Sequence, residues 1–83
     1  MAIITFKSKT EVFQFLGDIR RYVSASVVPL PKEMKVGCML AVQESLSSAP
    51  TAYYLVKGGR YPTFSGIFSV KKSGNRKIIN RMY

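Results

Sequence analysis

The spacing of hydrophobic and polar residues changes along the first part of the chain. Ala2 to Phe6 is rich in Ile and Thr, which predicts a strand with Ile4 and Phe6 on one face. From about Thr10 to about Ser24, apolar residues recur at steps of three and four, which predicts a helix with an apolar stripe. The stripe consists of Val12, Phe15, Leu16, Ile19, Tyr22 and Val23.

Two prolines end the helical pattern. Pro29 and Pro31 push the residue before each of them away from helical angles, so residues 24–32 are predicted to be an extended connector. Met34 to Val42 alternates like a strand but contains several good helix formers. We predict a strand there, because a helical projection would spread its apolar residues around the axis. A helix remains the alternative for this segment.

The pattern in the second half predicts more strands. Residues 45–51 have the composition of a loop, and Ala52 to Lys57 consists of β-forming residues that predict a strand antiparallel to the preceding one. Residues 58–59 are two glycines, which predict a turn. Thr63 to Lys71 alternates again, and one side of this strand is expected to face the core. That side carries Phe64, Gly66, Phe68 and Val70.

A hairpin closes the pattern. Ser73-Gly74-Asn75 is a short turn signal, which returns the chain through a strand from Arg76 to Tyr83. The elements predict a single small α+β domain over residues 1–83, mostly antiparallel, in the order β-α-β-β-β-β, with one amphipathic helix packed on one face of the sheet. We expect residues 1–50 to form a scaffold and residues 51–83 a basic, aromatic β-hairpin region.

Charge is distributed unevenly over this pattern. The chain has 83 residues and a net charge of +9, and all four acidic residues precede Pro50. A stretch of cations without acids attracts polyanions, and aromatic rings offer flat surfaces on which bases can stack. The seven cations after Pro50 are Lys57, Arg60, Lys71, Lys72, Arg76, Lys77 and Arg81. The same stretch contains six aromatic residues, among them Tyr53, Tyr54, Tyr61 and Tyr83.

These features predict a non-catalytic nucleic-acid-binding protein with little sequence specificity. Lys and Arg side chains would contact phosphates, and some of the tyrosines would stack on bases, which favours single-stranded DNA or RNA. The predicted site residues are Lys57, Arg60, Tyr61, Lys71, Lys72, Arg76, Lys77, Arg81 and Tyr83.

Two other interpretations of the same residues stay open. The cations could form an ordinary solvated face, with the tyrosines in the core or at its rim. Alternatively, the chain could be a small interaction or inhibitor protein, of a phage or mobile-element type, that docks its basic sheet on an acidic protein surface. An exposed strand edge, such as the one ending at Tyr83, could also pair with a second copy and form a homodimer.

Other chemistry is not expected. The chain has no His and its four acids are scattered, so neither catalysis nor a metal or cofactor site is predicted. The lone Cys38 is expected to be a small buried hydrophobic residue. No apolar run approaches the ~20 residues that a membrane span needs, and no signal peptide is apparent. We therefore expect a cytoplasmic protein without membrane contact.

One short segment resembles a known strand. Gly66 to Lys71 is similar to the Gly-x-Phe-x-Val-Lys strand of histone-like bacterial DNA-binding proteins. The long arm with a proline tip that follows in that family is missing from this sequence, so the chain is not assigned to the family. In composition the chain also resembles the small single-stranded DNA binders of filamentous phages, although the helix predicted from Thr10 argues against their all-β fold.

Overall fold

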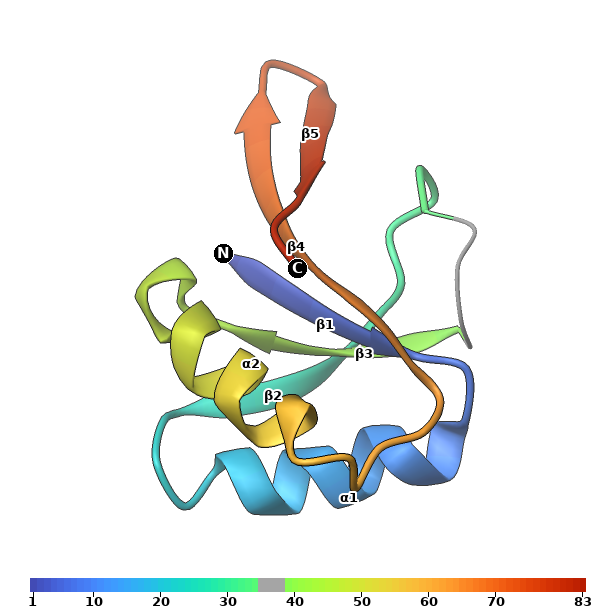
Figure 1. Ribbon diagram of the computed structural model, residues 1–83. Coiled ribbons are helices and arrows are strands. Elements are labelled where there is room, and N and C mark those ends of the chain that lie inside the picture. Colours follow the sequence, from blue (N-terminus) through green and yellow to red (C-terminus); the bar gives the residue numbers. More distant parts are fainter. Residues whose placement is uncertain (35–38) are drawn as a thin grey trace.

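The computed structural model describes residues 1–34 and 39–83 and places five strands in one antiparallel sheet (Figure 1). The sheet order is β2-β3-β1-β4-β5, and two helices cover one face, so the predicted α+β class is confirmed. The strands are β1 (Ala2–Phe6), β2 (Ala25–Pro29), β3 (Leu40–Glu44), β4 (Phe64–Ser73) and β5 (Arg76–Arg81). The helices are α1 (Lys9–Ile19) and α2 (Ala49–Lys57), with a 3-10 turn η1 (Leu46–Ser48) before α2.

The central strand β1 is buried along its whole length because it has a neighbour on each side. Ile4 is aligned with Val42 of β3 and with Ile67 of β4, and all three face the helices in the main core. On the opposite face, Ile3 begins a smaller cluster, whose other members are Ala41, Val70, Leu30 and Ile79. Both faces of β1 therefore contribute to stability through apolar burial.

Helix α1 begins as predicted and ends early. The Ser8 hydroxyl accepts a hydrogen bond from the Glu11 amide and so caps the first turn. The predicted stripe is buried from Val12 to Ile19, but the helix stops at Ile19 instead of Ser24. The Arg21 and Tyr22 amides bond to the carbonyls of Asp18 and Ile19, three residues back, which tightens the last turn and directs the chain toward β2. Tyr22, predicted to be in the core, is therefore exposed.

The strand predicted over Ala52–Lys57 is wrong, because these residues form most of α2. Pro50 lies in the first turn, where its missing amide costs no hydrogen bond. Ala49, Ala52 and Val56 are spaced so that one helical face is buried against the core. Packing of that face outweighs the β preference of the Tyr, Val and Thr residues in the segment.

The strand missing from the prediction is β2. Residues 24–32 are predicted to be an extended connector, but residues 25–29 of it pair with β3, from Ala25 opposite Glu44 to Pro29 opposite Leu40. Pro29 is tolerated because β2 is an edge strand and Pro29 is its last residue. Of the predicted strand Met34–Val42, the structure confirms the end, from Leu40 onward. Val36 and Cys38 lie outside the described residues.

A register shift between Thr5 and Phe6 changes which side of β4 faces the helices. Phe64 packs against the main core, as predicted, but after the shift Ile67 takes that side and is fully buried. Phe68, predicted to be a core residue, aligns with Ile3 on the opposite face and is only partly buried. The extra residue of a bulge inverts the alternation, which a strictly period-two pattern does not anticipate.

The second half of β4 extends past its neighbour β1. β1 pairs with β4 up to Ser69, whereas β5 pairs with β4 from Phe68 to Ser73. Val70 and Ile79 still pack beside Ile3, so residues 71–78 form the two-stranded ribbon that projects from the body of the fold, seen at the top of Figure 1. We call this ribbon the arm. Its turn has Gly74 at φ +63° and no positive φ at Asn75, which fits the tight type II′ hairpin turn.

Candidate nucleic-acid interface

The arm places cations on both of its faces. Residues directly opposite each other in an antiparallel pair lie on the same face. Lys72 is opposite Lys77, so this face carries two like charges side by side, whereas Lys71 is opposite Ile78 on the other face. Arg76 is opposite Ser73 and shares the face of Lys71. The arm can therefore contact anions from two sides.

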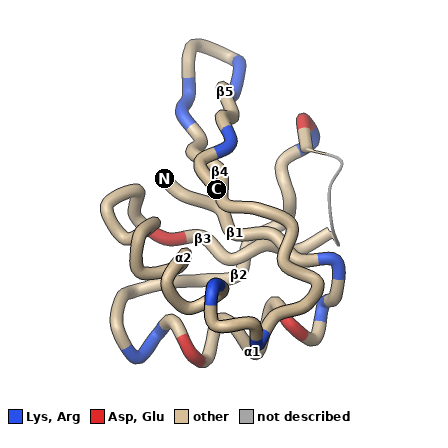
Figure 2. The backbone as a smooth tube through the Cα atoms, in the orientation of Figure 1, with Lys and Arg blue, Asp and Glu red and all other residues tan. Residues whose placement is uncertain are grey.

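These four arm cations are exposed and unneutralised. Lys71, Lys72, Arg76 and Lys77 are all exposed, and Figure 2 shows them at the far end of the molecule from the acidic residues of α1. In the described ranges 1–34 and 39–83, none of the four makes an ion pair. Like charges placed directly opposite each other destabilise a strand pair. A bound polyanion would remove that penalty.

Arg81 lies at the root of the arm and is held in place. Its guanidinium lies 5.6 Å from the centre of the Phe68 ring, and its Nη2 donates a hydrogen bond of 2.9 Å to the Ser65 carbonyl. Gly66 makes room for this arrangement, because a Cβ there would lie 3.0 Å from the Phe68 ring and 3.3 Å from Arg81 Cζ. The Arg81 charge is thus positioned beside the arm.

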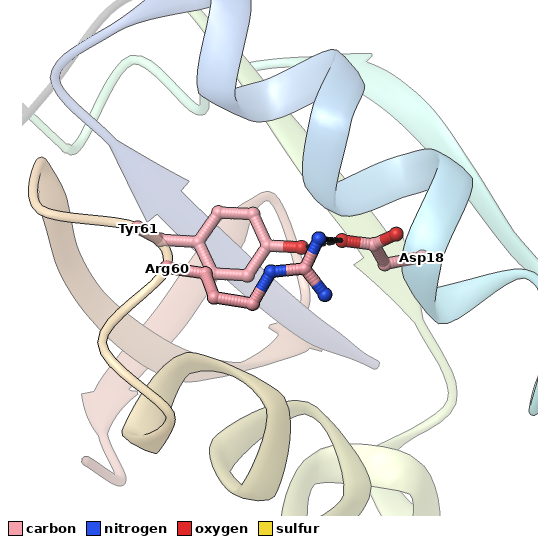
Figure 3. A network of polar contacts seen from close by, with 3 residues as sticks. All are labelled: Asp18, Arg60 and Tyr61. Atoms are coloured by element: carbon pink, nitrogen blue, oxygen red, sulfur yellow. Dashed lines mark hydrogen bonds and ion pairs between the residues drawn. The ribbon is translucent and has the colours of Figure 1, made fainter.

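Two predicted cations lie elsewhere. Lys57 is in the last turn of α2, where its charge complements the negative end of the helix. Arg60 lies in the following turn, and its Nη2 is 3.9 Å from Asp18 Oδ2 of α1 (Figure 3). With 74% of its side chain exposed, Arg60 gains little from this pair, but part of its charge is offset. Neither residue belongs to the arm.

Tyr61 is a core residue and not a stacking surface. It is 5% exposed, and its ring contacts Phe6 and Phe15 with centroids 5.7 and 5.3 Å apart. Its hydroxyl donates to Asp18 Oδ2, which ties the turn after α2 to α1 (Figure 3). Burial, followed by this hydrogen bond and the Asp18 charge, holds the pKa of Tyr61 well above its ordinary value. Its predicted contact with a base is therefore not possible in this fold.

Tyr83, by contrast, is accessible and has an aromatic partner. Its ring stacks on Tyr53 of α2, with centroids 4.2 Å apart and planes inclined by 11°. The Tyr83 amide donates to the Ile67 carbonyl, which anchors it beside the arm root. Both tyrosines are more than one third exposed. Part of each of the two residues is therefore accessible to a ligand.

Glu44 is a charged residue whose position the sequence did not indicate. It follows Val42 on the helix-covered face of β3, opposite Ala2 and Ala25, and is 4% exposed. Neither carboxylate oxygen has a hydrogen-bond partner in the described part of the chain. Burial raises the pKa of Glu44 from 4.5 to about 7.

In residues 1–34 and 39–83, no three His, Cys, Asp or Glu side chains come together as metal ligands would. None of the described helices has the length and apolar character needed to cross a membrane. Comparison with protein-family models, curated proteins and solved structures found none that matches this chain.

Proposed function

We propose that the chain is a non-catalytic, cytoplasmic nucleic-acid-binding protein that contacts phosphates through the arm, with little sequence specificity. Lys71, Lys72, Arg76 and Lys77 supply the contacts, and Arg81 extends them to the arm root. Phosphate contacts position a nucleic acid without reading its sequence. A ribbon with positive charge on both faces can contact the phosphates of a nucleic-acid strand whatever the bases of that strand are.

The observation that supports the proposal best is the Lys72–Lys77 pair. These two cations lie directly opposite each other on one face, and the sequence after Pro50 contains no acidic residue that could neutralise them. Their repulsion weakens the free hairpin. A phosphate near both ammonium groups turns this repulsion into attraction. We therefore infer that the working state of this surface contains an anion.

The test compares two triple substitutions that remove the same charge. The arm variant is Lys72→Gln, Arg76→Gln and Lys77→Gln. The control is Lys7→Gln, Lys9→Gln and Lys32→Gln, three exposed cations outside the arm. Fluorescence anisotropy measures the affinity of each for labelled single-stranded oligonucleotides across a range of salt concentrations.

If three phosphate contacts are lost, the arm variant binds roughly 100-fold more weakly near 0.1 M salt, and its log–log salt slope falls by about 2. The control should lose much less on both measures. Equal losses in the two variants would mean that net charge alone governs binding and that the arm has no special role. Absence of binding by the unmodified chain at low salt would exclude the proposed function.

A second candidate function is docking on an acidic protein surface. β5 is the last strand of the sheet, so its outer edge has no neighbour among the described strands and can accept a partner's strand. The same edge would serve a homodimer, but two copies of β5 would bring Arg76, Lys77 and Arg81 of each chain together. A pull-down from nuclease-treated lysate separates the candidates, because a protein partner survives nuclease treatment and a nucleic-acid tether does not.

A further inference from the structure

A groove on the surface is bordered by two exposed tyrosines that come from different elements. Tyr22 lies in the turn after α1 and is 64% exposed, and Tyr54 lies on α2 and is 77% exposed. The groove has a volume of about 310 Å³, at the lower end of the range for small-molecule sites. This size suits one flat group better than a large ligand. The remaining lining residues are Pro50, Thr51 and Leu55.

Two further exposed tyrosines link α2, which borders this groove, to the arm root. Tyr53 precedes Tyr54 on α2 and stacks on Tyr83, which is anchored to Ile67 at the arm root. We call these four exposed residues, Tyr83, Tyr53, Tyr54 and Tyr22, the tyrosine track. The fifth tyrosine of the chain, Tyr61, is buried. The track thus begins beside the arm and ends at the turn between α1 and β2.

Cations lie at both ends of the track. At the far end, Arg20 and Arg21 adjoin Tyr22 and line a second open cavity of about 500 Å³. Arg20 is held by a hydrogen bond of 3.1 Å from its Nε to the Ala25 carbonyl, and both arginines are exposed. At the near end, Arg81 lies at the arm root. No acid is found among the described residues that line the two cavities.

We infer that a single strand of nucleic acid runs from the arm along the tyrosine track, an inference that rests on the proposed function. One base of the strand lies in the Tyr22–Tyr54 groove, and phosphates of the strand lie at Arg20 and Arg21. Aromatic rings with cations at both ends provide both interactions that an unpaired strand offers, base stacking and phosphate attraction. A duplex keeps its bases paired and stacked internally, so its bases cannot enter the groove. The track therefore makes single strands the preferred ligand.

The test removes the two groove rings while keeping apolar side chains, with the double substitution Tyr22→Leu and Tyr54→Leu. The matched control is Phe13→Leu, which removes an exposed aromatic ring of α1 outside the track. Three labelled probes are compared by anisotropy: an oligothymidine of about 20 nucleotides, an abasic strand of equal length, and a duplex. The abasic strand has the same phosphates but no bases to stack.

The double variant should bind the oligothymidine at least about tenfold more weakly and leave binding of the abasic strand and the duplex unchanged. Circular dichroism establishes that it is folded. Because the chain has no Trp, quenching of tyrosine fluorescence by the oligothymidine gives an independent signal from the track. This quenching should be strong in the unmodified chain and in Phe13→Leu.

An unchanged affinity of the double variant for the oligothymidine would overturn the inference, and so would an equal loss on the abasic strand. In either case arm-dependent binding by the unmodified chain would leave the proposed function intact. If the unmodified chain binds none of the three probes, the proposed function itself fails.

Discussion

At the scale of single residues, Glu44 stands in an environment that penalises its charge. Its position opposite Ala2 and Ala25, whose side chains are small, leaves room for the carboxyl group but provides no donor among the described residues. Placing a carboxylate there without partners costs free energy, so the protonated form is favoured in the folded state.

We predict that this residue makes the chain less stable as the pH rises. The folded pKa of about 7 exceeds the ordinary value of 4.5, so between these values the folded state binds more protons than the unfolded state. The contribution is fully present below about pH 4.5 and is lost as the pH rises through about 7, a change of up to about 3 kcal/mol. Urea denaturation between about pH 5 and about pH 8 measures this change in the free energy of unfolding.

The control for this prediction is a comparison of two substitutions. Glu44→Gln should remove most of the pH dependence in this window, whereas Glu33→Gln, at an exposed site, should retain it. If the free energy of unfolding changes with pH in the same way for the unmodified chain and for Glu44→Gln between about pH 5 and about pH 8, the Glu44 carboxyl group does not titrate as described.

At the scale of elements, the arm depends on its turn. Gly74 has φ +63°, a conformation that a β-branched residue adopts only with strain of about 1–3 kcal/mol. A Cβ there would meet no atom within 4 Å, so the cost of Gly74→Val is confined to the backbone. Because the arm extends past β1, this strain should loosen the arm and leave the body of the sheet intact.

Hydrogen exchange detects this effect. In Gly74→Val, the amides of the arm should exchange about five- to a hundredfold faster, while those of β1 and β3 keep their rates. Ser73→Val places the same side chain at the neighbouring strand position and should leave arm exchange nearly unchanged. Faster exchange throughout the sheet would show that the arm and the body unfold as one unit.

Several elements were predictable because one physical signal dominated locally. The apolar stripe predicts most of α1, and the Ser73-Gly74-Asn75 turn predicts the hairpin. The sequence does not predict helix α2, because the β preference of its residues is a stronger signal than the two features that favour a helix. These features are a Pro in the first turn and the helical spacing of Ala49, Ala52 and Val56, which are buried. The face of Phe68 is predicted wrongly because the period-two alternation is continued through Gly66, although a glycine inside a strand often marks a bulge.

The candidate site was predictable to a similar extent. The absence of acidic residues after Pro50 points to the arm cations as a binding surface. The burial of Tyr61 could not be predicted in the same way, because it depends on contacts with Phe6 and Phe15, which are distant in sequence. The sequence places Tyr22 in the core because the helical spacing continues through it, although the helix ends at Ile19. The tyrosine track exists only once α2 and the turn after α1 are brought together.

At the scale of the whole molecule, the net charge of +9 acts against the compact state. The described residues contain one ion pair, Arg60–Asp18, so most of the positive charge is unopposed at close range. We predict that raising NaCl from about 20 mM to about 300 mM increases the melting temperature of the free chain while weakening oligonucleotide binding. The arm triple variant should show a smaller increase than the unmodified chain. A melting temperature that falls or stays constant with salt would contradict this prediction.

The position of β1 also constrains the order in which the chain can fold. Ile4 finds its two strand partners at Val42 and Ile67, so a growing polypeptide must be synthesised through β4 before its first strand is covered on both sides. Until then the β-prone segment Ala2–Phe6 exposes an edge that can associate with other nascent chains. Shortened versions lacking β4 should consequently aggregate instead of folding into a smaller sheet.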